Sequence, residues 1–448
     1  MAEHHSVSYN LDERYNFAPG IRRTAFIGIG VGVVLIIIGI ILAYFGGHEA
    51  AHGAGAEHAG HASEHASHAA EHGPVWLKRL FANLWINNVY FAGIAVCGVF
   101  FVAVQYVSWA GWSTVLLRIP QSFGFFLPIA GVLMVIYFLV AGMDAFHIFH
   151  GHGLFHWTVP GITDENSPEY DEVLASKTWY LSIPFFLIRM VAYFILWFGL
   201  FWMIRKRALR EDMEGGIELY DRNIVLSAIF IIFFAVTSVM AAWDWSMSAD
   251  PHWFSTMYGW YTFASWWVAC LATIILAVIY LKEQGYLPMV NANHLHDLGK
   301  FMFAFSIFWT YVWFAQFMLI YYANIPEEIY HFNEMLYGFG GKYKSLFFIN
   351  LFINFVFPFL ALMLREAKRK MRILKLVAWF ILAGHWLDFY LNMTPFMLGE
   401  DGGIGFMELG VIAVYVGTFV LVVGSALAKA PLIAKNHPML EESLHLNQ

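Results

Sequence analysis

The sequence predicts an all-α, polytopic membrane protein with ten transmembrane helices, and three observations lead to this prediction. Sixty per cent of the 448 residues are hydrophobic and only 13% are charged, whereas a soluble domain carries about 25% charged residues. A soluble domain this apolar would leave a large apolar surface in water, and the alternating strands of a β-barrel are less apolar segment by segment. Ten separate apolar runs are each long enough to cross a bilayer, which takes about 20 residues.

The first run, 24–46, follows a polar segment of mixed charge, residues 1–23. Its length matches a full span rather than the shorter apolar region of a cleavable signal peptide. The next runs are separated by polar connections, and interior prolines such as Pro128, Pro184 and Pro358 are expected to kink their helices, which a bundle tolerates. The remaining expected spans are 83–108, 120–143, 178–204, 223–247, 258–281, 300–324, 344–364, 372–394 and 404–427.

The basic residues predict the orientation of these spans. Of the 25 Lys and Arg residues, 19 fall on the side that holds both termini, five fall on the other side, and Arg189 lies inside a span. Cytoplasmic segments carry the excess of Lys and Arg. We therefore expect a multi-pass membrane protein with both termini in the cytoplasm. The net charge of −7 gives no indication of nucleic-acid binding.

Histidine is abundant, but most of the 20 histidines lie outside the spans. Seven fall in the outer loop at 48–72, where a seven-residue repeat would align several of them along one stripe of a helix. A weak metal site is one interpretation of that stripe, and a solvated low-complexity loop is the other. The four histidines that would form the metal site are His58, His61, His65 and His68.

Two cysteines, Cys97 and Cys270, are too few for an iron–sulfur cluster, and no C-x-x-C-H haem attachment motif is present. If the protein takes part in electron transfer, such centres are expected in partner subunits. A haem b ligated by two histidines could use only His147 and His385, which would allow one haem and not two.

Charged and polar side chains inside spans are costly and usually mark a site or a buried pair. Asp144 and His147, at the end of the third run, are three residues apart and would share a helix face. His385 and Asp388 have the same spacing in the ninth run. The other candidates are single side chains within or beside a span: Arg189, Asp244, Gln316 and Glu408.

With the termini inside, the buried acids and histidines all fall in the outer half of the membrane. The inner half is expected to hold no comparable buried carboxylate, only polar side chains such as Gln105, Gln121 and Thr237. A titratable outer cluster suits quinol oxidation, in which a carboxylate or histidine takes the hydroxyl proton. It also suits a proton path. A purely structural alternative is that Asp144 and His147 pair with Arg189.

Three stretches resemble the F subunit of bacterial alternative complex III, which belongs to the polysulfide-reductase membrane subunit family. They are WDWSMSADPHWFSTMYGWY at 243–261, HDLGKFMFAFSIFWTYVWFAQFMLIYYANIPEE at 296–328 and HPMLEESLH at 437–445. The resemblance implies two four-helix bundles, at 83–247 and 248–394. It adds a flanking first helix at 24–46 and a last helix within 395–427, and it implies a bacterial inner-membrane location. The outer loop at 47–82 and the cytoplasmic tail at 428–448 follow from the expected spans and their orientation, and the histidine-rich insert has no part in the resemblance.

The resemblance also implies a complex that oxidises menaquinol or ubiquinol and passes electrons to cytochrome c or directly to a terminal oxidase. Its partners would be a homologous quinone-binding membrane subunit, an iron–sulfur subunit, c-type haem subunits, small membrane subunits and lipids. The chain would not be catalytic alone. Asp144, His147, Asp244, His385 and Asp388 carry over as quinone-site or proton-path residues. A non-catalytic, proton-conducting scaffold is the alternative, and a secondary transporter is disfavoured because no inverted pair of interrupted helices is evident.

Overall fold

The computed structural model describes residues 9–53 and 74–447, and helices dominate that part of the chain. It confirms the ten expected spans, although two of them are broken into shorter helices. The four candidate metal-binding histidines, His58, His61, His65 and His68, lie outside the described residues. The spans are α1 (Pro19–Gly53), α3 (Val75–Val107), α4 with α5 (Arg118–Phe123 and Leu127–Tyr137), α7 (Ile183–Glu214), α8 (Ile217–Trp245), α9 (Tyr258–Glu283), α10 (Ala292–Ala323), α12 with α13 (Lys344–Leu351 and Phe357–Leu362), α14 (Met371–Leu398) and α15 (Phe406–Leu427).

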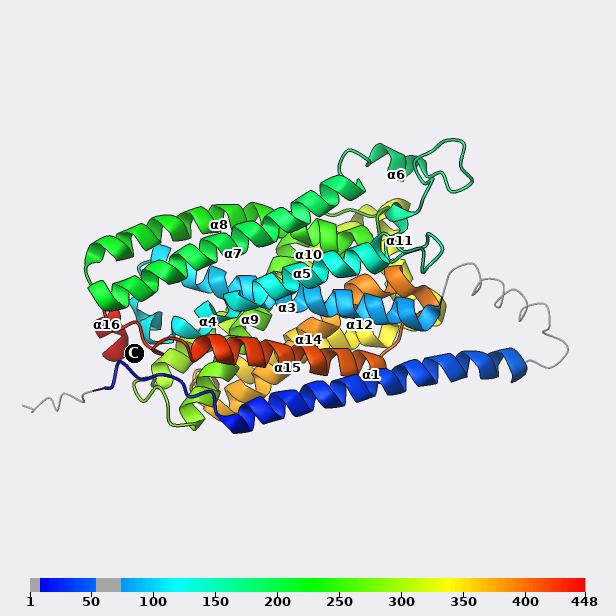
Figure 1. Cartoon of the computed structure of the whole chain (residues 1–448). Coiled ribbons are helices and arrows are strands. Elements are labelled where there is room, and N and C mark those ends of the chain that lie inside the picture. Colours follow the sequence, from blue (N-terminus) through cyan, green and yellow to red (C-terminus); the bar gives the residue numbers. More distant parts are fainter. Residues whose placement is uncertain (1–8, 54–73, 448) are drawn as a thin grey trace, which may run out of the picture.

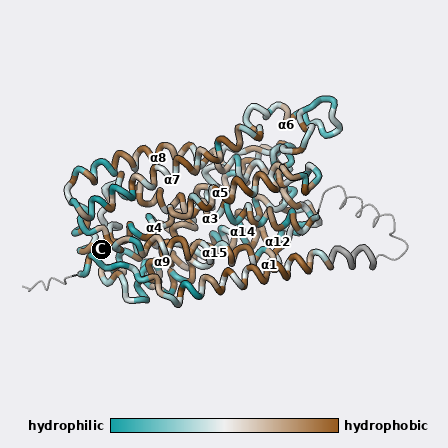
Figure 2. The backbone as a smooth tube through the Cα atoms, in the orientation of Figure 1, coloured by the Kyte–Doolittle hydropathy of each residue, from teal (hydrophilic) through white to brown (hydrophobic). Residues whose placement is uncertain are grey.

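The spans run alongside one another as a bundle (Figure 1). Helices α3, α5, α7 and α8 pack together, as do α9, α10, α13 and α14, and the contacts of α3 with α9 and α14 join the two groups. Apolar residues fill the middle of every span, and polar residues gather at the helix ends (Figure 2). The side chains exposed along the spans are largely apolar, as expected for a surface that faces lipid or other membrane subunits.

Helices α1 and α15 form a pair on the outside of the bundle, and α1 packs mainly against α15. Glycines allow the two backbones to approach closely. A Cβ atom at Gly410 would lie 2.6 Å from the carbonyl oxygen of Gly32, and one at Gly39 would lie 2.7 Å from the backbone nitrogen of Met407. Small residues at such contacts let membrane helices associate through van der Waals packing. The opposite side of α1 remains exposed.

Pro128, Pro184 and Pro358 each fall in the first turn of α5, α7 or α13. Proline is tolerated there because the first N–H groups of a helix have no intrahelical partner. Pro184 stands at the start of its span, so the prediction of a kink is wrong for this residue. In the third and eighth spans the regular α-helix is interrupted just before Pro128 and Pro358, by a 3₁₀ turn, Gly124–Phe126, and a π-helical turn, Phe352–Val356. The third span also ends in a π-helical turn, Phe138–Gly142.

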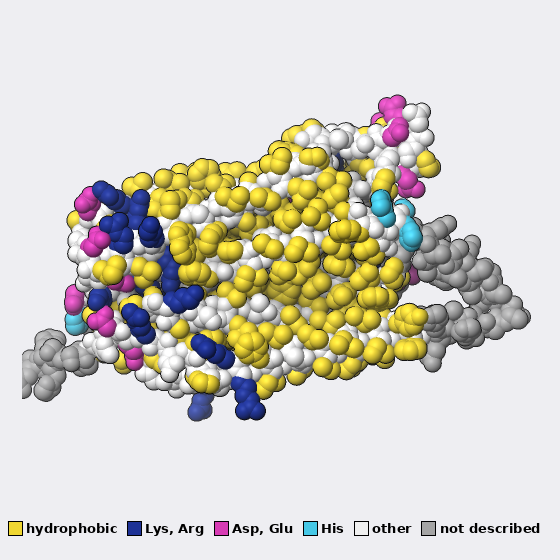
Figure 3. All heavy atoms as spheres, in the orientation of Figure 1, with side chains coloured by type: hydrophobic (Ala, Val, Ile, Leu, Met, Phe, Trp, Pro, Cys, Tyr) yellow, Lys and Arg dark blue, Asp and Glu magenta, His cyan; other side chains and the backbone are white. Residues whose placement is uncertain are grey.

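Both described termini lie at one end of the bundle, which we call the terminal end. Glu13 accepts a hydrogen bond from the backbone N–H of Leu432 at 2.9 Å, so the two terminal segments contact each other. Lys and Arg side chains gather at this end in Figure 3, which agrees with the uneven distribution of charge. The assignment of this end to the cytoplasm stays a prediction.

Candidate functional site

The opposite end of the bundle, which we call the loop end, holds the connections 143–182, 246–257, 324–343 and 399–405. The short helices α6 (Glu172–Ser176) and α11 (Pro326–Leu336) lie there, away from the C-terminus (Figure 1). Most of the sequence candidates fall in or near this end. Their surroundings differ greatly, however, and they do not form one cluster.

Asp144 and His147 do not share a helix face, so that expectation is wrong. The third span ends at Gly142, and both residues adopt left-handed backbone conformations, with φ of 49° and 53°. The Asp144 carboxylate accepts backbone N–H groups of Ile148, Phe149 and Gly151 at 2.7–3.0 Å. It therefore holds the loop in shape, whereas the His147 side chain is exposed.

Arg189 pairs with Asp244 rather than with Asp144 or His147. Its Nε and Nη2 atoms donate to the two Asp244 oxygens at 2.9 and 2.8 Å, which joins α7 to α8. The Tyr193 hydroxyl also donates to Asp244 at 3.0 Å, and the guanidinium lies 4.0 Å from the ring centre of Tyr180. Bidentate geometry and cation–π contact make this a well-compensated buried pair.

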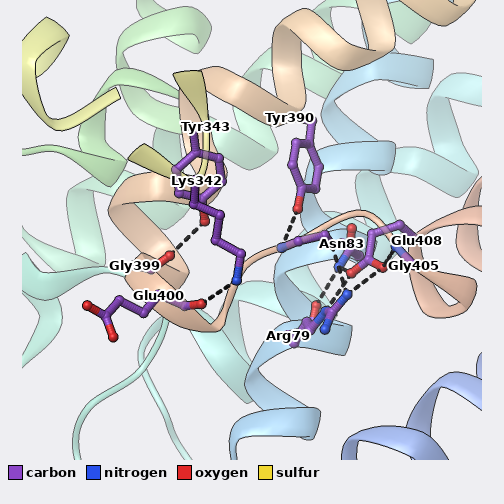
Figure 4. Close-up of polar contacts among 10 residues, drawn as sticks. Arg79, Asn83, Lys342, Tyr343, Tyr390, Gly399, Glu400, Gly405 and Glu408 are labelled. Atoms are coloured by element: carbon purple, nitrogen blue, oxygen red, sulfur yellow. Dashed lines mark hydrogen bonds and ion pairs between the residues drawn. The ribbon is translucent and has the colours of Figure 1, made fainter. Parts of the chain in front are cut away.

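Glu408 is fully buried and its oxygens are saturated with donors (Figure 4). Arg79 donates to both oxygens at 2.7 and 2.8 Å, and Asn83 donates at 2.9 Å. The backbone N–H of Gly405 donates at 2.7 Å, so Glu408 also caps the start of α15. This arrangement links α3 to α15 and leaves the carboxylate little capacity for chemistry.

Asp388 differs from these acids because every group that donates to it is neutral. It is 1% exposed in the middle of the second bundle. Its oxygens accept from Tyr261, and from Ser265, Trp309 and Asn350 at 2.9–3.1 Å. No Lys or Arg in the described part of the chain forms an ion pair with it. A buried carboxyl group among neutral donors can bind and release a proton.

His385 extends this cluster by one hydrogen bond. Its Nδ1 atom lies 2.9 Å from the Ser265 hydroxyl oxygen, and the same hydroxyl donates to Asp388. When Asp388 is ionised it accepts the single Ser265 proton, and Nδ1 of His385 then carries the proton in its contact with Ser265. Its Nε2 atom is buried and has no hydrogen-bond partner among the residues that the structure describes. The sequence expectation that His385 and Asp388 act together is thus consistent with their geometry, although Ser265 stands between them.

A narrow cavity adjoins Asp388. Its lining includes Tyr261, Gln316, His331 and Asn350, and its free volume of about 20 Å³ suffices for one water molecule. The Gln316 Oε1 atom is buried without a hydrogen-bond partner. The cavity is far too small for a quinone ring. It can connect Asp388 to neighbouring polar groups through water.

A second, larger pocket opens at the loop end between the segment before α7 and the segment before α9. Its free volume is about 300 Å³, at the lower limit for small-molecule sites. Five of its twelve lining residues are aromatic: Trp179, Tyr180, Trp243, Trp253 and Phe254. We call it the aromatic pocket.

Donors near the aromatic pocket lack partners. The indole N–H groups of Trp243 and Trp253 are buried without a hydrogen bond among the described residues. Lys177 also lines the pocket, with Nζ 5.9 Å from the ring centre of Phe254. Desolvation by burial lowers the pKa of this ammonium group. The two indole N–H groups are buried away from the pocket surface, so the walls of the pocket are almost entirely apolar, with Lys177 as the cationic side chain among the lining residues.

Bis-histidine ligation of a haem by His147 and His385 does not fit this geometry. His147 is exposed on the loop after the third span, and His385 is fully buried between α9, α10 and α14. Two axial ligands must face one cavity from opposite sides. These two histidines do not face a common cavity.

Two groups of buried polar residues were not predicted from the sequence. His331 on α11 is 3% exposed, and its Nδ1 atom lies 2.8 Å from Asp250. At the terminal end, Glu211 and Asp212 are buried, and Asp212 pairs with Arg118. The expectation that the inner half has no buried carboxylate is therefore wrong. The error arises from the predicted end of the fourth span at residue 204, because α7 continues to Glu214.

No protein-family model matches the sequence, and no curated protein matches it either.

Proposed function

We propose that this membrane protein is a subunit of a quinol:cytochrome c oxidoreductase of the alternative complex III type, in which it provides a quinone site and an outward proton path. The observation that carries the proposal is the fully buried Asp388, which lies among neutral donors beside a water-sized cavity. The resemblance of the stretches 243–261, 296–328 and 437–445 to the F subunit adds to it. The first two of these stretches contribute Tyr261, Trp309 and Gln316 to the surroundings of Asp388.

The aromatic pocket is a better binding site for a quinone ring than the Asp388 cavity. A quinone ring needs apolar, aromatic walls and donors for its two carbonyl oxygens. The pocket has the volume and the apolar walls, and its lining includes Lys177, whose ammonium group donates to the carbonyl oxygen of Pro251 at 2.6 Å. The Arg189–Asp244 pair lies next to it, because Tyr180 both lines the pocket and covers the Arg189 guanidinium.

The proton path would use the Asp388 cluster. His385, Ser265 and Asp388 form a continuous hydrogen-bonded row, and Tyr261 connects Asp388 to Asn392. Asp388 and His385 can exchange a proton, and Ser265 and Tyr261 can reorient their hydroxyls, which is what a relay within a membrane requires. Electrons would pass through haem and iron–sulfur centres of partner subunits.

The test begins with the intact assembly. The chain, tagged at its C-terminus and purified in mild detergent from its native membrane, should co-purify with c-type haem and quinol-dependent cytochrome c reduction. Membranes that lack the chain should lose that activity. Unchanged quinol oxidation without the chain, or a purified chain free of redox partners, would refute the proposal.

The Asp388→Asn variant then tests the site, with the exposed Asp164→Asn as a matched control. General acid–base groups contribute about 10²–10⁴-fold to rates. We therefore expect turnover of the Asp388→Asn complex to fall at least 100-fold, and that of the control to stay unchanged.

The proton-conducting scaffold remains the second candidate, and the small volume of the Asp388 cavity favours it, because that cavity admits water and not a quinone. The two candidates separate by ligand binding. A scaffold would leave the binding of a quinone-site inhibitor to the complex unchanged when the aromatic pocket is altered.

A further inference from the structure

The connection between α13 and α14, residues 363–372, concentrates positive charge at the terminal end. It reads MLREAKRKMR and holds five basic residues beside a single acid, Glu366. It packs against the start of α10, where Asn291 and Asn293 donate to the backbone oxygen of Leu446 in the C-terminal tail. This contact places it at the end of the bundle that holds both described termini. We call residues 363–372 the basic hairpin.

Most of the charge on the basic hairpin has no counter-charge within the described part of the chain. Lys368 is the one basic residue with internal partners, because its Nζ atom donates to the backbone oxygens of Leu362, Met363 and Leu364 at 2.5–3.3 Å and so caps the end of α13. The other four basic side chains form no ion pair or hydrogen bond with any described residue, and they are Arg365, Arg369, Lys370 and Arg372.

Acidic residues on the helices beside the hairpin do not offset this charge. Asp297 on α10 already pairs with Lys300 at 2.6 Å, and Glu283 at the end of α9 pairs with Lys375 at 2.8 Å. Glu366, inside the hairpin, is exposed and has no ion-pair partner among the residues that the structure covers. The hairpin therefore presents a group of cations to whatever lies beside it.

Long apolar side chains are interleaved with these cations. Met363 and Leu364 are 55% and 67% exposed, and Met371 is 38% exposed. The adjoining helices continue this apolar surface, with exposed Leu360 on α13 and Leu376 on α14. The cations lie where the apolar surface of two membrane spans ends, and that is the level of the lipid headgroups. Cations mixed with exposed apolar side chains suit the boundary between headgroups and acyl chains.

We infer that the basic hairpin binds the phosphate of an anionic phospholipid, whose acyl chains contact Met363, Leu364 and Met371. An arginine can donate two parallel N–H groups to phosphate oxygens, and a lysine adds a compact positive charge. Clusters of about four to eight basic residues directly beyond a transmembrane helix are typical of sites for anionic headgroups. This lipid site is independent of the quinone site.

The test measures lipid binding to the full-length chain in detergent by native mass spectrometry. Phosphatidylglycerol is the probe, and phosphatidylcholine with the same acyl chains is the zwitterionic comparison. Each basic residue near an anionic headgroup is expected to strengthen binding about fivefold. The double variant Lys370→Gln with Arg372→Gln should therefore bind phosphatidylglycerol about 25-fold more weakly and leave phosphatidylcholine binding unchanged. Both side chains are exposed, so their loss should not disturb the fold.

The double variant Arg210→Gln with Arg222→Gln is the matched control, because it removes the same charge at the same end of the bundle. Both arginines are exposed, and each pairs with a glutamate one helical turn away, Glu214 or Glu218. We expect this variant to bind phosphatidylglycerol like the wild type. Equal losses in the two double variants would show that overall charge attracts the lipid, and the inference would then be wrong. Equal affinity of the wild type for the two lipids would overturn it as well.

Two further experiments separate a lipid from other ligands. Glycerol 1-phosphate carries the phosphate without acyl chains, and we expect it not to displace the lipid; displacement at equal concentration would indicate a soluble phosphate site instead. In native membranes, carbodiimide couples a lysine to a carboxylate in contact with it. Coupling of Lys370 to an acidic side chain of another protein would show that a protein covers the hairpin and would overturn the lipid assignment, whereas the absence of such coupling supports it.

Discussion

The Glu408→Gln variant should destabilise the fold without impairing chemistry. The glutamate oxygens accept four hydrogen bonds, two from Arg79 and one each from Asn83 and Gly405. A glutamine keeps one acceptor oxygen and turns its amide N–H₂ toward the donors on the other side. Either orientation of the amide therefore loses one charge-assisted and one neutral hydrogen bond.

The magnitude follows from those two bonds. A hydrogen bond to a charged group contributes about 1.5–3 kcal/mol and a neutral one about 0.5–1.5 kcal/mol. Arg79 is 22% exposed, so water can solvate part of its unpaired charge. We expect a loss of about 2–4 kcal/mol. If the whole chain unfolds together, the unfolding entropy per residue converts this loss to a decrease of about 2–4 °C in Tm.

The assay can use the protein's own cysteines. Cys97 and Cys270 are both fully buried, so a thiol-reactive fluorescent dye reports when α3 and α9 become accessible. Glu400→Gln is the matched control, because Glu400 is exposed and only its backbone oxygen binds Lys342 (Figure 4). Equal melting temperatures for the two variants would refute this account. So would quinol oxidation that falls in Glu408→Gln while the fold stays intact.

Three further predictions test other parts of the structure. Trp243→Phe removes part of the aromatic wall of the aromatic pocket and should weaken inhibitor binding by about 0.5–1.5 kcal/mol, or about 2–10-fold, whereas the lipid-facing Trp202→Phe should not. Burial lowers the pKa of His437 to about 4. The folded tail therefore holds this histidine neutral, its stability is complete above about pH 6.5 and it loses about 3 kcal/mol as the pH falls to 4. Protease cleavage of the tail should rise over that range, and His437→Gln should abolish the dependence. Gly410→Ala should separate α1 from α15 and cost about 1–3 kcal/mol in the dye assay, whereas Gly30→Ala meets no atom within 4 Å and should be neutral.

The sequence predicted the spans well because each is a local property. A run of about 20 apolar residues must cross the membrane as a helix, since its backbone has no other way to satisfy its hydrogen bonds. The predicted helix boundaries were less accurate, and the error at one of them hid two buried carboxylates. Basic residues beyond Ile204 suggested a loop, but α7 continues to Glu214 and buries Glu211 and Asp212. Periodicity within a charged stretch was the signal that could have extended the helix.

Pairings between distant segments were harder to predict. Asp244 pairs with Arg189, 55 residues away in the sequence, and Asp250 contacts His331, 81 residues away. Spacing within one helix, such as that of His385 and Asp388, can be evaluated from the sequence. Contacts between loops depend on how the spans pack, and one sequence carries no signal for them. His331 was overlooked for that reason, because it lies on a short polar helix outside every apolar run.

Buried acids in this membrane protein differ in the groups that donate hydrogen bonds to their carboxylates. These donors indicate the role of an acid better than its burial does. Asp244 and Glu408 each have an arginine that donates to both oxygens, and Asp144 accepts three backbone N–H groups. Adding a proton to any of these removes interactions that hold helices or a loop together, so protonation would be costly. Asp388 has only neutral donors and a cavity for water. Among these four acids, the same burial therefore produces structural anchors in three places and an exchangeable carboxyl group in one. Mutations of the anchors should first affect stability, and a mutation of Asp388 should first affect turnover.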